Sequence, residues 1–101
     1  MATRRAGADP GLLVLVSLAA GSKHGHAILR DIERFAGARL GPGTLYGAIE
    51  RLEADELIES VANDDPRRRP YRLTESGATY LRTRLATLAD VTRVGLERVQ
   101  S

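Results

Sequence analysis

The chain has 101 residues, the size of one domain with a single core, which excludes a multidomain enzyme. It contains no cysteine, which excludes disulfides, thiolate nucleophiles and cysteine-based zinc sites. The net charge is only +2, yet Lys23 is the single lysine among 15 basic residues, so the rest are arginines, whose planar guanidinium suits phosphates and guanine edges. Codon bias in a GC-rich genome explains this composition equally well, so the positions of the arginines must decide.

The first predicted helix begins at Pro10, with Asp9 as its N-cap, and ends at Gly21. It is apolar around nearly its whole circumference, so we expect one face to pack on its own domain and another to need a partner subunit. Its apolar run, Leu12 to Ala20, is far shorter than the roughly 20 residues of a membrane helix. We therefore expect a cytoplasmic protein without a membrane span. We also expect residues 1–8 to form a flexible arm.

Two more helices follow in the sequence. After a connection through residues 21–25, the second helix runs to Gly37 and carries an apolar face at helical spacing, made of Ile28, Ile32, Phe35 and Ala36. The third helix spans roughly Pro42 to Asp55 and places Leu45, Ile49 and Leu52 on one face, with Thr44, Tyr46, Gly47 and Arg51 opposite. Proline at the first position favours a helix start at Pro42.

A hairpin and a long last helix complete the predicted order. Two extended runs, around Ile58 and around Tyr71, flank a connection rich in charge and proline. Thr74 can cap the last helix, whose broad apolar stripe runs almost to the C-terminus. We therefore expect a mainly α chain with a small antiparallel β-hairpin: a winged helix-turn-helix over residues 1–76, followed by a dimerisation helix over residues 77–101.

The start of the third helix is the first candidate for function. In a helix-turn-helix this helix enters the major groove with its N-terminal residues toward the bases. Gly43 permits close approach of the backbone, the helix N-terminus attracts phosphate, and the hydroxyls of Thr44 and Tyr46 can donate hydrogen bonds. An alternative interpretation is that Pro42 and Gly43 only shape a turn and Tyr46 covers the edge of the core.

The hairpin tip is the second candidate. Arg67, Arg68 and Arg69 lie where a wing can reach the DNA backbone or the minor groove. The alternative is a solvated run of charge, partly neutralised by Asp64 and Asp65. The position of these arginines at a turn favours the wing.

The later part of the third helix is acidic and does not suit a surface that lies along phosphates. This part of the helix has one basic residue, Arg51, and four acidic ones: Glu50, Glu53, Asp55 and Glu56. We therefore predict that only the first turns of this helix enter the groove. Arg51 is either a DNA contact or the ion-pair partner of nearby carboxylates.

Several ordered motifs resemble those of the PadR family of bacterial transcriptional regulators. They are Gly43-Thr44-Leu45-Tyr46, then Arg51-Leu52-Glu53 and Leu57-Ile58-Glu59. His24-Gly25 is similar to the family's signature at the second helix, and residues 69–77 are similar to its second wing strand running into the last helix. Together these motifs cover most of the chain.

The resemblance implies a homodimeric repressor that binds an inverted-repeat operator and dimerises through its last helix, often against the partner's first helix. It also implies that Tyr46 contacts DNA, with Gly43 and Thr44 as the docking turn. The dimer residues that we expect are Leu12, Val16, Leu85, Leu88, Val91, Leu96 and Val99.

Two residues depart from the family pattern. Gly47 stands where the family usually has proline, and it opens room at the DNA surface; His26 stands where the family usually has tyrosine. Some similar short proteins bind flat aromatic drugs between subunits through tryptophan, which this chain lacks. The sequence therefore does not identify a small-molecule effector.

These features together predict a DNA-binding transcriptional regulator, most simply a dimeric repressor released by a ligand or another signal. The expected DNA-binding residues are Gly43, Thr44, Tyr46, Gly47, Arg51, Arg67, Arg68 and Arg69. The alternative function is a winged-helix protein-interaction module. No cofactor, metal site or catalytic constellation is expected, because His24 and His26 lack a third ligand and His24 more simply caps or packs at the start of the second helix.

Overall fold

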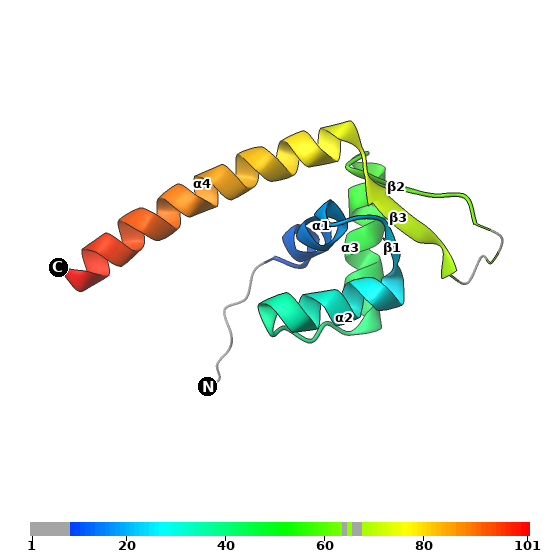
Figure 1. The fold of residues 1–101 in the computed structure, drawn as a ribbon, viewed down its shortest axis with the longest axis horizontal. Helices are drawn as coiled ribbons and strands as arrows, with labels where there is room; N and C mark the ends of the chain where they lie inside the picture. The colour runs from blue at the N-terminus through cyan, green and yellow to red at the C-terminus, as the bar shows by residue number, and fades with distance from the viewer. Residues whose placement is uncertain (1–8, 64, 66–67) are drawn as a thin grey trace.

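The computed structural model describes residues 9–63, 65 and 68–101, and these residues form a mainly helical fold with one small sheet (Figure 1). The elements in chain order are α1 (Pro10–Ala19), β1 (Lys23–His24), α2 (Gly25–Ala36), α3 (Pro42–Ala54), β2 (Ile58–Ser60), β3 (Pro70–Leu73) and α4 (Glu75–Gln100). The predicted architecture of three helices, a wing and a long last helix is confirmed.

Helix α1 lies at the centre of the fold, in contact with α2, α3, α4 and β3 (Figure 1). Its residues Leu13, Val14, Leu15 and Leu18 are buried in the core, together with apolar side chains of α2 and α3. Most of its apolar surface is covered within the chain: Leu12, which we expected at the dimer interface, is buried in this same core, and Val16 is partly buried. That one face of α1 packs on a partner subunit stays a prediction.

Helix α2 extends beyond the core at its C-terminal end. Ile28 and Ile32 are fully buried, as the helical spacing predicts, but Phe35 is 45% exposed and Ala36 is also exposed. Periodicity identified the apolar face of α2 but not the point at which the neighbouring helices stop covering it. Gly37 ends the helix in the left-handed region, with φ of 65°, which glycine adopts without steric cost.

The wing is a three-stranded antiparallel sheet with the order β1-β3-β2, rather than a hairpin alone. Strand β1 was not expected, because two residues are too few to show an alternating pattern. Lys23 pairs with Tyr71 of β3 on one side, and Glu59 of β2 pairs with Arg72 on the other, where their side chains form an ion pair of 2.9 Å. Strand β1 therefore ties the wing to the start of α2.

Three helices begin at the side-chain caps that the sequence predicts. The carboxylate of Asp9 accepts from the backbone N–H of Leu12 at 3.1 Å, and the Thr74 hydroxyl accepts from that of Gly77 at 2.9 Å. His24 Nδ1 accepts from the N–H of Ala27 at 3.3 Å, so the expectation that His24 caps α2 is confirmed.

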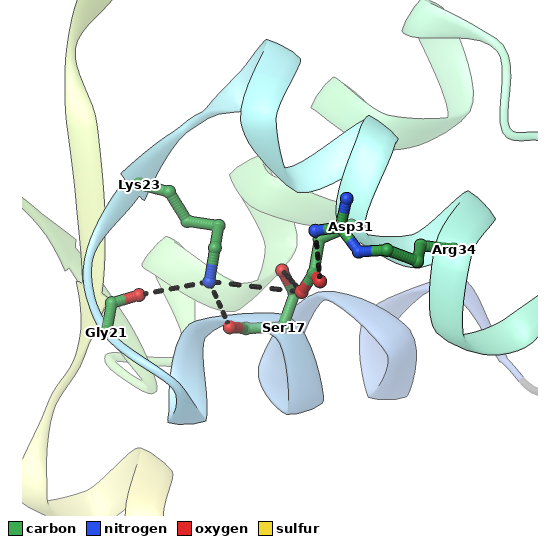
Figure 2. A network of polar contacts seen from close by, with 5 residues as sticks. All are labelled: Ser17, Gly21, Lys23, Asp31 and Arg34. Atoms are coloured by element: carbon green, nitrogen blue, oxygen red, sulfur yellow. Dashed lines mark hydrogen bonds and ion pairs between the residues drawn. The ribbon is translucent and has the colours of Figure 1, made fainter.

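A polar network joins α1, β1 and α2 (Figure 2). The hydroxyl of Ser17, which is almost completely buried, donates to Asp31 at 2.7 Å, and the Lys23 ammonium donates to the Ser17 carbonyl at 2.6 Å. Arg34 approaches Asp31 at 3.2 Å. The Ser17 hydrogen bond, with help from the charges of Lys23 and Arg34, holds the pKa of Asp31 below its ordinary value, against the opposing effect of burial.

Helix α4 starts within the fold and then leaves it (Figure 1). Gly77 and Leu81 are buried against the body, whereas the rest of the helix is mostly exposed. The first two turns therefore belong to the same core as the winged helix, although they follow the expected domain boundary at residue 76.

Candidate nucleic-acid interface

The first turn of α3 offers an open backbone surface. Pro42, Gly43 and Thr44 are exposed, and within the described residues no side chain caps this helix. The first N–H groups of a helix lack intrahelical acceptors, so they can donate to an external anion. A Cβ added to Gly43 or Gly47 would meet nothing within 4 Å, so both glycines face open space.

Tyr46 lies one turn further along α3 and combines exposure with a fixed position. The residue is 47% exposed, yet its ring is packed against the backbone of Gly25 at the start of α2. The two interpretations of Tyr46 from the sequence, a DNA contact or a cover for the core edge, are therefore compatible. One side of the ring meets α2 while the rest of the side chain stays accessible.

Tyr71 of β3 lies near Tyr46 and is half-buried. Burial raises the pKa of the Tyr71 hydroxyl above its ordinary value of 10.0, and the negative charge of Glu53 acts in the same direction, while Arg69 opposes it. Tyr71 is thus a neutral packing residue at neutral pH. It was seen in the sequence only as part of a strand.

The described part of the wing tip is close to the start of α2. Arg68 and Arg69 are exposed, whereas Arg67 lies outside the described residues. A guanidinium nitrogen of Arg68 lies 3.4 Å from His24 Nε2, and the Arg68 carbonyl accepts from the side-chain amide of Asn63 at 2.8 Å. His24 therefore lies between the wing and the helices, a role that its place in the His24-Gly25 motif did not reveal.

The other end of α3 is acidic. Glu53, Glu56, Glu59 and Glu75 line a shallow hollow where α3, β2 and α4 meet. Arg51 is exposed and forms no ion pair with any of the described carboxylates, so the ion-pair alternative for Arg51 is not realised. Within α3, the surface suited to an anion is therefore the N-terminal part.

Helix α4 carries two different faces beyond Leu81. One face is charged, and Arg93 lies 3.5 Å from Asp90 and 3.8 Å from Glu97. The other face is an unpartnered apolar stripe whose side chains are 36 to 83% exposed: Leu85, Leu88, Val91, Leu96 and Val99. Val16 of α1, the other residue that we expected at the dimer interface outside α4 besides Leu12, is partly buried and packs against the core.

Residues 14–83 match the profile of a family described as the transcriptional regulator PadR-like family. The chain belongs to this family. The resemblance inferred from the motifs is thereby confirmed, and the family consists of transcriptional regulators rather than enzymes. In the part of the chain that the structure describes, no helix is long and apolar enough to cross a membrane.

Related proteins include regulators from several organisms. The chain is 38% identical over 72 residues to the transcriptional regulator Rv3488 of Mycobacterium tuberculosis, in an alignment covering 69% of this chain and 66% of that protein. It is 30% identical over 94 residues to the transcriptional activator GvpE2 of Halobacterium salinarum, covering 92% and 47%. It is 44% identical over 81 residues to an uncharacterized 37.1 kDa protein in transposon TN4556 of Streptomyces fradiae, covering 80% and 23%. The matched region thus spans less than two thirds of each relative.

Solved structures share this fold. A transcriptional regulator from Clostridium thermocellum is 26% identical, with a TM-score of 0.78 and coverage of 87% of each chain. A PadR family transcription regulator from Clostridium difficile has a TM-score of 0.81 at 23% identity, covering 91% of this chain and 99% of that one. The latter likeness establishes the fold alone.

Proposed function

We propose that this PadR-like chain binds DNA sequence-specifically as a homodimer, most simply as a repressor on an inverted-repeat operator. The observation that carries the proposal is the surface formed by the open first turn of α3 and the exposed Tyr46. Backbone N–H groups at a helix start bind phosphate, and side chains of the first turns reach base edges in the major groove.

The wing supplies positive charge beside this surface. Arg68 lies against His24, directly before the start of α2, and the exposed Arg69 follows it in the chain, which supports a contact of the wing with the DNA backbone that flanks the groove. Gly47 and Arg51 extend the same helix, with the first turns as the part that enters the groove. We include Arg67 in the proposed DNA-binding wing only because it precedes Arg68 in the sequence.

A second copy of the chain would cover the apolar stripe of α4. In a two-fold dimer, two recognition helices meet successive major grooves about 34 Å apart, so the pairing of the α4 helices would set the operator spacing. In this arrangement residues 1–76 carry DNA binding and residues 77–101 carry dimerisation. A ligand or another signal that changes the angle between the α4 helices would release the DNA.

The test is fluorescence anisotropy with DNA from the protein's own upstream promoter and a scrambled control, each titrated at low and physiological salt. We expect selective binding that survives physiological salt, with affinity falling as salt rises because counterions are released from the phosphates. Weak binding to both DNAs that salt abolishes would contradict specific recognition.

A protein-interaction module is the second candidate function, and the acidic hollow at the end of α3 favours it. Binding of a basic protein surface to this hollow would weaken as salt rises, as DNA binding does, so selectivity for DNA rather than the salt slope separates the two functions. A protein partner captured at the hollow, together with no selective DNA binding, would support this alternative.

A further inference from the structure

Gly25 and Tyr46 are in closer contact than two ordinary residues at these positions could be. A Cβ built on Gly25 would collide with the Tyr46 hydroxyl oxygen, and it would lie 2.8 Å from Cζ and 3.1 Å from Cε1 of the same ring. All three nearest atoms belong to Tyr46. Gly25 is itself buried, so the ring covers it.

The conformation of the backbone does not require glycine at this position. Gly25 is the first residue of α2, and its φ lies outside the left-handed region; in the described part of the chain only Gly21 and Gly37 among the glycines have positive φ. An alanine would suit helical backbone better than glycine. The missing Cβ therefore serves the close approach of the ring.

The contact joins the two helices of the helix-turn-helix at their DNA-facing ends. Tyr46 reaches from the second turn of α3 to the first turn of α2, next to His24 and, through it, to Arg68 of the wing. A methyl group on Gly25 would displace the ring from α2. Since nearly half of the Tyr46 side chain is exposed, the displaced ring would move toward solvent rather than into the core.

We infer that Gly25 is a positioning residue for DNA recognition: it holds the ring of Tyr46 at the height and angle at which the exposed part of this side chain meets the DNA. This inference rests on the proposed function of the α3 surface. Gly25 touches no DNA itself and acts only through Tyr46.

A double-mutant cycle tests the inference, with operator affinity measured by anisotropy for the wild type, Gly25→Ala, Tyr46→Ala and the double variant. We expect Gly25→Ala and Tyr46→Ala each to weaken specific binding by about 5- to 100-fold. The Tyr46→Ala background is the matched control, because it keeps the backbone change and removes the ring. There Gly25→Ala should cause no further loss.

The conservative variant Tyr46→Phe adds a second test. It removes the atom that would lie nearest to the new methyl group, so Gly25→Ala should weaken binding less in the Tyr46→Phe background than in the wild type. The salt slope should stay unchanged in all variants, because no phosphate contact of a basic residue is altered. A loss that came from unfolding would instead lower the circular dichroism signal and the thermal midpoint.

A direct readout comes from an NMR nuclear Overhauser effect between the Gly25 α-protons and the Tyr46 ring in the protein without DNA. Wild-type affinity in Gly25→Ala, an undiminished loss in the Tyr46→Ala background, or a missing Overhauser effect would overturn the inference. Failure of the wild type to bind DNA selectively would overturn the proposed function instead. The Overhauser effect would then still show whether Gly25 seats the ring.

Discussion

The Thr74 hydroxyl donates a hydrogen bond of 2.7 Å to the carbonyl oxygen of Glu56, and this contact fixes the start of α4 to the turn that follows α3. The backbone N–H of Thr74 donates to the carbonyl of Leu57 at 3.1 Å. Gly77 packs so closely on that carbonyl that a Cβ would collide with it. The direction of α4 is therefore set by the end of the proposed recognition helix.

Thr74→Ala should destabilise the fold by about 1 to 2 kcal/mol, because it removes both the N-cap of α4 and the bond to Glu56. The control Thr74→Ser keeps the hydroxyl and should lose much less. Urea unfolding followed by circular dichroism measures both variants. Equal midpoints for Thr74→Ala and the wild type would show that the hydroxyl contributes nothing to this junction.

Glu56→Gly should stabilise the fold by up to about 1 kcal/mol. Glu56 has φ of 61°, a left-handed conformation that costs a residue with a Cβ about 1 to 2 kcal/mol, while glycine costs about 0.5 to 1 kcal/mol of extra chain entropy. Asp55→Gly is the matched control, since Asp55 has φ of −85° and gains no relief of strain. An Asp55→Gly variant that is as stable as Glu56→Gly in the same urea titration would contradict this account.

Asp31→Asn should destabilise the fold at pH 7 by about 1 to 3 kcal/mol, because a charged acceptor of the Ser17 and Arg34 hydrogen bonds is removed. The pKa of Asp31 is lower in the folded state than its ordinary value of 3.8, so folding favours the charged form. This stabilisation is complete above pH 3.8 and is lost as the pH falls through the lower folded pKa.

The free energy of unfolding of the wild type and of Asp31→Asn should therefore converge as the pH falls below 3.8. Denaturant titrations at several pH values measure this difference. Glu33→Gln is the control, because Glu33 forms an exposed ion pair with Arg39 at 3.3 Å, and such pairs contribute little. A gap between wild type and Asp31→Asn that does not change with pH would contradict the role of the Asp31 charge.

Leu88→Asp should convert the proposed dimer to monomers, because it places an unpaired charge within the apolar stripe of α4. Thr83→Asp introduces the same charge about 140° around the helix from Leu88, and that variant should remain dimeric. Sedimentation equilibrium measures both. Dimers of Leu88→Asp with the wild-type dissociation constant would place the interface elsewhere.

Replacing Arg68 and Arg69 with alanine should reduce the slope of log affinity against log salt by about one unit for each DNA phosphate that the wing no longer neutralises. Arg93→Ala removes one positive charge from α4, where Arg93 is paired with Asp90, and should leave the slope unchanged. The slopes come from anisotropy titrations at four or more salt concentrations. An unaltered slope in the wing variant would mean that the tip stays in solvent.

Local chemistry made much of this fold predictable. The caps at Asp9, His24 and Thr74 and the left-handed stop at Gly37 depend on residues within one helical turn, so the sequence displays them directly. Helical periodicity and the turn residues predicted the order of the elements, and the PadR motifs agreed with it.

Features that depend on distant residues could not be predicted in the same way. Strand β1 exists because it pairs with β3, more than 40 residues later, and the exposure of Phe35 depends on where other helices end. The Gly25–Tyr46 contact combines two motifs that were interpreted separately, one as a family signature and one as a docking turn. The Ser17–Asp31 bond joins residues of two different helices, 14 positions apart, so no local pattern displays it.

Because Lys23 takes part in the Ser17–Asp31 network, a modification that removes its charge would affect the packing of the helices. Acetylation, which removes the charge of a lysine, has one side-chain target in the sequence, and that target holds α1 to β1 and α2. The other basic side chains are arginines, which stay charged at any physiological pH and are not substrates of lysine acetylation. An acetyltransferase acting on this sequence would therefore loosen the scaffold while leaving the charge of the wing intact.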